Sequence, residues 1–351
     1  MPELDSLRFF AFLAVFIFHS FSQETPYYID RGLPGWAASV AVSIVSVGWC
    51  GVDLFFLLSS YLITSLLVRE QERIGRIDLR AFYFRRALRI WPLYFFFILI
   101  AGVIMPPLFP FIDPLKKHEA VSLLTFTLNW DAGFRGLGLN PANVLWSVSL
   151  EEQFYAAWPI VIFFAGVKRL RSISIFILLA LILIRVGCFF AGINSALTSP
   201  TILRWEPMAL GVLIAVVPIP PISQLIRISL LLLGLFLPIL CTASGINPAT
   251  TYPIVAASCG LILVSIVGES GFCLRNPVLT YLGKISYGLY VYHILILKLS
   301  GHINIGSHLP LIRNALALGL TILTAALSYR YIETPFLRLK NHFARIQSRP
   351  I

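Results

Sequence analysis

Arg8 and His19 are eleven residues apart in an apolar segment, a spacing that places both side chains on one face of a helix. At about 3.6 residues per turn, eleven residues make about three turns and separate the side chains by about 16 Å. Asp5 joins the same face, three residues before Arg8. A guanidinium can bind an anion, whereas an imidazole can take up and release a proton. Ionisable groups in such a segment are costly in lipid and are usually functional.

Two further arginines have a spacing suited to anion binding. Arg86 and Arg89 are three residues apart at the entrance of an apolar run, so both lie on one helix face. Two guanidinium groups there could grip a phosphate. The alternative is a topology signal, because seven arginines lie between Arg69 and Arg89.

The segment from Trp146 to Tyr155 supports two interpretations. Ser149 and Glu152 match a capping box, which would make Glu152 a structural residue at a helix start. Glu151 is not needed by such a cap and could face a cavity. Trp146 and Tyr155 could belong to an interfacial belt or form a platform for a sugar. His293, in a later aromatic run, is either held by helix backbone or functional.

The composition indicates an integral membrane protein. Hydrophobic residues make up 58% of the chain, charged residues 12%, and the mean hydropathy is +0.85. The net charge of +11 comes from short clusters between apolar runs, which favours topology or lipid headgroups over nucleic acid as the partner. The five cysteines are scattered singly without metal-ligand spacing, so we expect no metal site.

The apolar runs predict about ten transmembrane helices. No small-residue cleavage site follows the first segment, so we expect it to be retained as the first span. The nine further spans are 50–68, 88–105, 150–166, 172–192, 203–217, 226–242, 250–268, 279–299 and 310–330. Gly48 and Gly51 interrupt the long apolar stretch 36–68, whose outer part we expect to be a separate interfacial or re-entrant helix.

The basic segments orient these spans. The arginine-rich segment 69–89 belongs on the cytoplasmic side, so both termini are predicted to be cytoplasmic. The apolar stretch 119–129 is too short to span comfortably, and leaving it out also places Lys168, Arg169 and Arg171 inside. Arg338, Lys340, Arg345 and Arg349 then lie inside as well, and residues 106–148 form a long extracytoplasmic loop.

This topology sorts the polar residues by depth. The cytoplasmic group is Asp5, Arg8, Arg85, Arg86, Arg89, Lys284, Arg330 and Glu333. The outer group is His19, Asp53, Glu151, Glu152, Arg204, Glu206 and His293. An anionic ligand inside and acid–base chemistry outside would fit this distribution.

Six motifs in this order resemble the acyltransferase-3 family, which contains bacterial polysaccharide and lipopolysaccharide O-acetyltransferases. They are residues 4–8 with His19, and residues 51–63, 84–92, 146–155, 286–293 and 333–335. One departure is Ser59-Ser60, where the family's second-span signature has Ser-Gly and a closer backbone approach. By this resemblance residues 1–351 form a single membrane acyltransferase domain without the soluble hydrolase-like domain that some members append. The expected location is the bacterial cytoplasmic (inner) membrane, as a multi-pass protein in the lipid bilayer.

The resemblance implies acyl transfer from cytoplasmic acyl-CoA, most simply acetyl-CoA, to a hydroxyl of an extracytoplasmic carbohydrate or glycoconjugate. The expected donor-binding residues are Arg8, Arg85, Arg86 and Arg89. The expected acceptor-binding residues are Trp146, Ser147, Tyr155, Arg204 and Glu206. The catalytic candidates are His19, Asp53, Glu151, Glu152 and His293.

His19 would act as general base, or would carry the acyl group itself as a covalent intermediate. Asp53 or Glu151 could orient its imidazole, and His293, Ser59 or a backbone N–H could stabilise the oxyanion. The competing class is a transporter or flippase of a lipid-linked glycan, which no inverted repeat supports. Only a transferase would release CoA thiol. A lipid-binding scaffold leaves the acid–base residues without a purpose.

Overall fold

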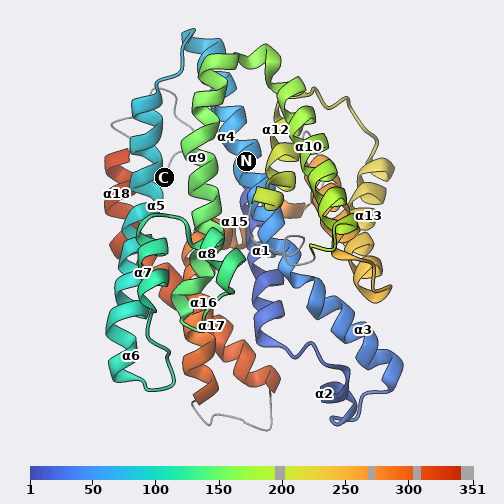
Figure 1. Ribbon diagram of the computed structural model, residues 1–351, viewed down its shortest axis with the longest axis vertical. Helices are drawn as coiled ribbons and strands as arrows, with labels where there is room; N and C mark the ends of the chain where they lie inside the picture. The colour runs from blue at the N-terminus through green and yellow to red at the C-terminus, as the bar shows by residue number, and fades with distance from the viewer. Residues whose placement is uncertain (194–201, 268–272, 303–309, 341–351) are drawn as a thin grey trace. The chain divides into compact units, whose positions relative to one another are not determined.

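Helices are the only regular secondary structure in the part that the computed structural model describes, residues 1–193, 202–267, 273–302 and 310–340 (Figure 1). The predicted all-α class is therefore confirmed. The helices form two compact units, each built from two stretches of chain. The first unit comprises Met1–Ser65 and Lys168–Lys284, and the second comprises Leu66–Val167 and Ile285–Ile351. A single membrane domain over the whole chain stays a prediction.

The first unit begins with the helix that carries Arg8 and His19. Its described elements are α1 (Pro2–Ser20), α2 (Thr25–Ile29), α3 (Gly35–Ser46), η1 (Val47–Trp49), most of α4 (Cys50–Ile74), η4 (Val167–Arg169), α10 (Leu170–Phe190), η5 (Ile202–Trp205), α12 (Glu206–Val216), α13 (Gln224–Ala243), α14 (Pro248–Ile266), η6 (Cys273–Arg275) and α15 (Pro277–Lys284). The three boundaries between the units fall within α4, within η4 and between α15 and α16.

The second unit contains the arginine-rich segment and the segment from Trp146 to Tyr155. Its described elements are the end of α4, α5 (Leu79–Ile98), η2 (Leu99–Ile104), α6 (Met105–Leu108), α7 (Lys117–Leu124), α8 (Leu128–Arg135), η3 (Pro141–Leu145), α9 (Trp146–Ala165), α16 (Ser286–His302), α17 (Pro310–Ser328), η7 (Tyr329–Glu333) and α18 (Thr334–Lys340). Two of them, η2 and η7, are π-helical. Such π-helical turns occur frequently at functional sites.

Local sequence signals explain several helix ends. The Asp78 side chain accepts a hydrogen bond from the Ala81 N–H at the start of α5, and Ser223 caps α13 in the same way. Asn247 caps α14, whose first residue is a proline that needs no hydrogen-bond partner for its nitrogen. Gly166 ends α9 at φ +73°, a conformation that glycine adopts without strain.

The core of the first unit lies among α1, α4 and α14. Its buried residues are Leu4, Leu7, Ala11, Leu54, Leu57, Leu58, Tyr61, Val255, Cys259, Ile262, Leu263 and Ile266. Gly48 and Gly51 let α1 approach closely, because a Cβ atom at either position would overlap a backbone carbonyl oxygen of α1. A 3-10 turn, η1, separates α3 from α4 at this contact, whereas the interfacial or re-entrant placement of α3 stays a prediction.

Aromatic side chains bind the helices of the second unit together. Phe97 of α5 meets Tyr292 of α16 edge to face, with ring centroids 5.6 Å apart. The Tyr292 hydroxyl donates to Ser328 Oγ at 3.1 Å, and the buried Tyr94 hydroxyl donates to the Leu123 carbonyl at 2.8 Å. These contacts link α5 to α16 and α7, and α16 to α17.

Six helical stretches among the described residues are long and apolar enough to cross a membrane. They are Gly35–Ile74, Leu79–Leu108, Val167–Phe190, Gln224–Ala243, Ala249–Ile266 and Pro310–Leu339. The protein is therefore a multi-pass membrane protein, in agreement with six of the ten predicted spans. The other four segments are helical but shorter or more polar, so the count of ten and the cytoplasmic termini stay predictions. Arg345 and Arg349 lie outside the described residues.

The region 106–148 contains helices of its own. Residues 119–129 fall on α7, a turn and α8, each helix having eight residues. Eight residues extend only about 12 Å, far less than the roughly 30 Å hydrocarbon core. Residues 119–129 are therefore too short in either helix to span the membrane, in agreement with the prediction.

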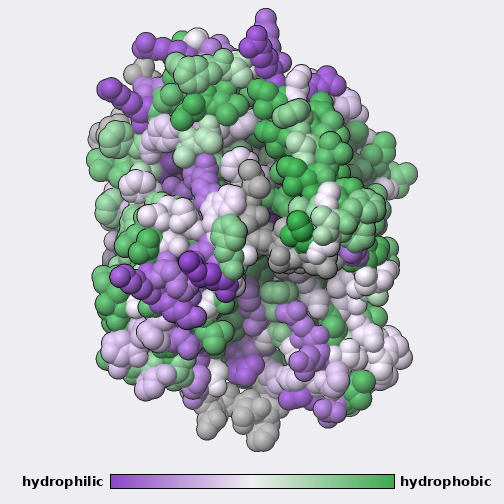
Figure 2. Space-filling view, viewed as in Figure 1, coloured by the Kyte–Doolittle hydropathy of each residue, from purple (hydrophilic) through white to green (hydrophobic). Residues whose placement is uncertain are grey.

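The surface differs between helices of the two units. Hydrophobic side chains gather over α10 and α13 (Figure 2), where Phe176, Leu183 and Phe190 are each at least 70% exposed. Continuous exposed apolar surface of this kind is suited to lipid contact. Hydrophilic side chains gather over α7 and α8 (Figure 2).

Candidate functional site

The first unit places Arg8 and His19 on one uninterrupted helix, α1. Arg8 pairs with Asp5 at 3.6 Å, one turn earlier, as the spacing predicts. His19 is exposed near the end of the helix, and its Nδ1 lies 3.0 Å from the Val15 carbonyl oxygen. Because a carbonyl can only accept, Nδ1 carries the proton in this contact and the basic lone pair is on Nε2.

The beginning of α4 packs against this end of α1. Gly48, just before α4, faces Ala14 and Phe18, which are neighbours of His19 on α1. Asp53 lies in the first turn of α4, is 1% exposed and pairs with Arg204 at 2.8 Å. The Asp53 carboxylate therefore has a buried cationic partner on η5.

A second buried ion pair involves Glu206, two residues after Arg204 of the first pair. Arg185 of α10 is fully buried and forms a two-pronged ion pair with Glu206, at 2.9 Å from Nε and 3.0 Å from Nη2. The Tyr252 ring contacts both arginines, with its centroid 4.9 Å from the guanidinium carbon of Arg185 and 4.6 Å from that of Arg204. Asp53, Arg204 and Glu206 thus belong to a buried, charge-balanced cluster in the first unit.

In the second unit α5 carries the three motif arginines, Arg85, Arg86 and Arg89, in different surroundings. Arg85 pairs with Glu70 at 3.3 Å. Arg86 lies over two aromatic rings, 5.7 Å from the centroid of Phe82 and 5.3 Å from that of Tyr155. Within the described ranges, neither Arg86 nor Arg89 forms an ion pair at 4.0 Å or less.

The predicted capping box at Ser149 and Glu152 is wrong. Helix α9 begins at Trp146, directly after η3, so Ser149 lies inside the helix and donates to the Leu145 carbonyl at 3.3 Å. The backbone N–H groups at this position already have helical partners and need no cap. Glu152 therefore has no role as a helix start, and its catalytic assignment stays a prediction.

Both glutamates of α9 have side-chain donors. The Tyr155 hydroxyl donates to Glu151 Oε2 at 2.8 Å, and the Trp91 indole donates to Glu152 Oε2 at 3.1 Å. Glu152 Oε1 is buried and has no hydrogen-bond partner among the described residues. Burial of such an oxygen is costly unless a ligand or water completes it.

Tyr290 of α16 is a hydrogen-bond partner of two predicted site residues, Ser147 and His293. The Ser147 hydroxyl donates to Tyr290 Oη at 2.7 Å, and the Tyr290 hydroxyl contacts the Val144 carbonyl at 3.2 Å. His293 is fully buried, and its Nδ1 contacts the Tyr290 carbonyl of its own helix. Trp146 is half-buried as the first residue of α9.

Glu333 ends the π-helical turn η7 and is only 6% exposed. Its Oε1 is also buried without a hydrogen-bond partner among the described residues, and Arg89 is its electrostatic neighbour. The second unit thus holds two arginines without close ion pairs and two carboxylates with an unpaired buried oxygen. Such a set can bind an anion and exchange protons.

Several of these contacts were not predicted from the sequence. Arg185 is a lone charge in the apolar run 172–192, and that isolation is the signal that it needs a buried partner. Trp91 and Tyr252 carry no comparable signal, because a tryptophan or tyrosine near a span end is common.

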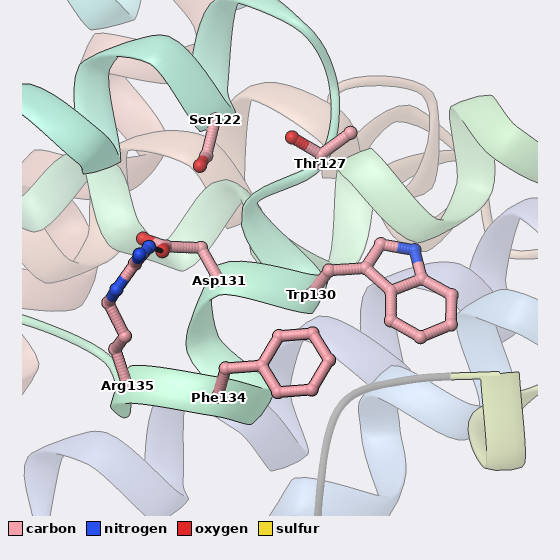
Figure 3. Close-up of a pocket in the computed structure, with 6 residues that line it drawn as sticks. All are labelled: Ser122, Thr127, Trp130, Asp131, Phe134 and Arg135. Atoms are coloured by element: carbon pink, nitrogen blue, oxygen red, sulfur yellow. Dashed lines mark hydrogen bonds and ion pairs between the residues drawn. The ribbon is translucent and has the colours of Figure 1, made fainter.

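A cavity of about 420 Å³ lies in the second unit on α7 and α8, outside all the predicted site residues. It is lined by Ser122, Thr127, Trp130, Asp131, Phe134 and Arg135 (Figure 3). Asp131 accepts from His118 at 2.6 Å and also pairs with Arg135. Burial would raise the pKa of the Asp131 carboxyl, but the hydrogen bonds from His118 and Arg135 outweigh it and lower this pKa below its ordinary value of 3.8.

Comparison with known proteins gives one family and a set of bacterial relatives. The family model described as an acyltransferase domain matches residues 1–331. The O-acetyltransferases OatA of Staphylococcus aureus strains NCTC 8325 / PS 47, COL and MRSA252 are each 30% identical to this chain over 362 residues. The match covers 95% of this chain and 57% of each relative, so the chain spans little more than half the length of these proteins. No solved structure matches the chain. Since the family model covers nearly the whole sequence, the chain belongs to the acyltransferase family.

Proposed function

We propose that the protein is a membrane O-acetyltransferase that moves an acetyl group from cytoplasmic acetyl-CoA to a hydroxyl of an extracytoplasmic carbohydrate. The observation that carries the proposal is the state of the second unit's polar groups. Arg86 and Arg89 lack close ion pairs, and Glu152 and Glu333 each have a buried oxygen without a hydrogen bond among the described residues. Unsatisfied buried groups of this kind are rare in purely structural positions.

The phosphates of CoA suit the arginines of α5. Two guanidinium groups on one helix face can hold a phosphate through several charge-assisted hydrogen bonds. Arg86 and Arg89 are the favoured donor-binding residues, because Arg85 already pairs with Glu70 and Arg8 with Asp5. A longer acyl-CoA would satisfy the same contacts, since they address only the nucleotide part.

His19 is assigned as the general base. Its Nε2 removes the proton of the acceptor hydroxyl, the oxygen attacks the thioester carbonyl, and the tetrahedral intermediate collapses to an ester and a CoA thiolate. The protonated imidazole then returns its proton to the thiolate, so no charge is left behind. The Val15 carbonyl supports this role by holding the proton on Nδ1.

The acyl-histidine route uses the same residue in another order. In it His19 Nε2 attacks the thioester first and CoA leaves as the thiolate, after which the acceptor hydroxyl displaces the neutral imidazole and its proton passes to the thiolate. The Asp53 pairing with Arg204 favours a structural role for Asp53, whereas Glu151 and Glu152 stay candidates for proton transfer. Trp146, Ser147 and Tyr155 stay candidates for acceptor contact.

The test is acetyl-CoA-dependent release of CoA thiol by the whole chain in native membranes that contain envelope glycan. We expect His19→Ala to reduce release at least about 100-fold, the scale of a lost general base. His302→Ala is the matched control, because His302 is exposed on α16 and is assigned no role. Undiminished release by folded His19→Ala would refute the assignment, and no release by the unaltered protein would favour a transporter.

The same preparation separates the two routes. After brief incubation with acetyl-CoA alone and acid quenching, peptide mass spectrometry should find His19 unmodified if it is a general base. An acetyl group on that peptide would establish the covalent route instead.

A further inference from the structure

The cavity on α7 and α8 has the shape of a small ligand site. Its volume of about 420 Å³ lies within the roughly 300–1,000 Å³ typical of small-molecule pockets. Four lining residues come from α8 at helical spacing, as two adjacent pairs four residues apart, and Ser122 and Thr127 approach from α7 and the following turn (Figure 3).

The lining combines aromatic faces with hydrogen-bonding groups. Trp130 and Phe134 stack with ring centroids 6.4 Å apart and are 36% and 80% exposed. The Asp131 carboxylate meets the Arg135 guanidinium at the cavity (Figure 3), so acceptors and donors lie next to one another. The two hydroxyls from Ser122 and Thr127 add groups that can both donate and accept.

The charge balance restricts the ligand. Asp131 would repel an anion such as a free phosphate, and Arg135 would repel a quaternary amine. A neutral ring with an apolar face and several hydroxyls meets every feature of the lining: its C–H face covers the aromatic platform, and its hydroxyls exchange hydrogen bonds with the ion pair. Sugar rings have this chemistry.

The cavity is rigidly joined to the helix of the motif glutamates. Gln153 of α9 accepts from the Trp130 indole at 3.3 Å and donates to the Phe126 carbonyl at 2.7 Å. Phe126 has φ +54°, the only non-glycine residue with positive φ among those described, and its ring stacks on Trp91, which donates to Glu152. A strained residue held by its surroundings is a feature of functional sites.

We propose that the α7–α8 cavity binds one sugar ring of a neutral glycan. Trp130 provides the stacking face, and Asp131 with Arg135 selects the ring hydroxyls. The cavity then serves as the acceptor-binding subsite, which rests on the proposed function, whereas sugar binding itself does not.

Binding is measured by saturation-transfer difference NMR on the full chain in lipid nanodiscs, with maltotriose, cellotriose and chitotriose as probes. We expect transfer to at least one of the three. Trp130→Ala should raise its Kd at least about tenfold, equivalent to about 1.4 kcal/mol. Trp130→Phe keeps an aromatic face and should keep binding although it loses the hydrogen bond to Gln153. Trp36→Ala is the matched control, because Trp36 is 75% exposed on α3, and should bind as the unaltered protein does.

Two further variants protect the test if Trp130→Ala does not fold. Phe134→Ala and Asp131→Asn should each weaken binding, the first through the platform and the second through the hydroxyl contacts. Absence of transfer from all three probes overturns the proposal, as does equal affinity in the folded Trp130, Phe134 and Asp131 variants.

A membrane anchor is the opposing result. If brominated lipids quench the tryptophan fluorescence of the unaltered protein more than that of Trp130→Ala, the cavity faces lipid and the proposal fails. Thiol release separates the two proposals. If it needs His19 while no probe binds, only the sugar site is refuted. If probes bind without thiol release, the transferase and the acceptor role of the cavity are refuted, while sugar binding stands.

Discussion

The arginines of the two units differ in how completely their charge is matched. In the first unit Arg185 and Arg204 are at most 5% exposed, and each forms an ion pair of 3 Å or less with a buried carboxylate. In the second unit Arg86 and Arg89 form no ion pair at 4.0 Å or less within the described ranges. Arg185 and Arg204 therefore each have a short ion pair, whereas Arg86 and Arg89 have none among the described residues, and this difference assigns the second set to a ligand.

The same contrast holds for the carboxylates. Both oxygens of Glu206 receive hydrogen bonds from Arg185, whereas Glu152 and Glu333 each keep one buried oxygen without a partner among the described residues. Local hydrophobicity alone would not separate Glu206 from Glu152, because both lie next to apolar runs of the sequence. The ion pair with Arg185 favours a structural role for Glu206, whereas the oxygens of Glu152 and Glu333 without a partner among the described residues favour a role in catalysis.

The largest expected effect comes from breaking the buried ion pair of the first unit. Arg185→Met leaves the Glu206 carboxylate buried without its cation, which should cost about 3–5 kcal/mol of stability. The midpoint of thermal unfolding in nanodiscs, followed by tryptophan fluorescence, should fall clearly. Arg185→Met with Glu206→Leu removes both charges and should recover most of the loss. If the single variant were fully stable but inactive, Arg185 would belong with the residues that act in ligand binding or catalysis.

The next largest effect concerns Arg86, which forms no close ion pair within the described residues. Arg86→Lys keeps the charge but loses the guanidinium fork, so the KM for acetyl-CoA should rise about 10–100-fold, or about 1.4–2.8 kcal/mol. The unfolding midpoint should hardly change. Arg80→Lys is the matched control on the same helix, because Arg80 is exposed. A lowered unfolding midpoint with an unchanged KM for Arg86→Lys would show that Arg86 is a structural residue and not a ligand-binding one.

Two isosteric substitutions compare the carboxylates directly. Glu333→Gln removes a buried charge without breaking an ion pair, so stability should change by less than about 1 kcal/mol or rise slightly, while thiol release falls. Glu206→Gln weakens the fork to Arg185 and should lower the unfolding midpoint. Equal midpoints for the two variants would show that pairing does not distinguish them.

The smallest effect is a pH dependence at the α7–α8 cavity. Hydrogen bonds from His118 and Arg135 lower the pKa of Asp131 below 3.8, so its stabilisation is present above that pH and is lost as the pH falls through the lowered pKa. Between pH 5 and pH 3 the unfolding midpoint of the unaltered protein should fall a few degrees more than that of Asp131→Asn. Parallel curves would remove Asp131 as a stabilising group.

The sequence predicted what depends on local spacing. Arg8, Asp5 and His19 share α1 because helical periodicity needs no knowledge of partners, and the break at Gly48 follows from glycine in an apolar run. The pairing of Arg185 with Glu206 joins different helices, and no spacing rule specifies which of them meet. The family resemblance supplied the candidate residues, but not their pairing.

One prediction was wrong, and one element was not foreseen, both for local physical reasons. The Ser149 and Glu152 spacing fitted a capping box, yet η3 starts the helical conformation earlier, with Asn140 as its cap, so the helix was already formed at Ser149. Residues 128–135 were treated as part of a loop, although Trp130, Asp131, Phe134 and Arg135 have helical spacing. Short helices in long loops give weak periodic signals.

The anchoring of α1 has a consequence for the order of assembly. The Ser6 hydroxyl donates to the Leu274 carbonyl, 268 residues later, and Glu3 pairs with Arg275. At about 5–20 residues per second, the ribosome delivers these partners roughly 13–54 s after α1. During that interval the charged start of the first helix has no native partner from η6 or α15. Maturation should therefore depend on an insertase or chaperone that shelters it, and nascent chains stalled before residue 274 should be degraded faster than chains stalled after Lys284.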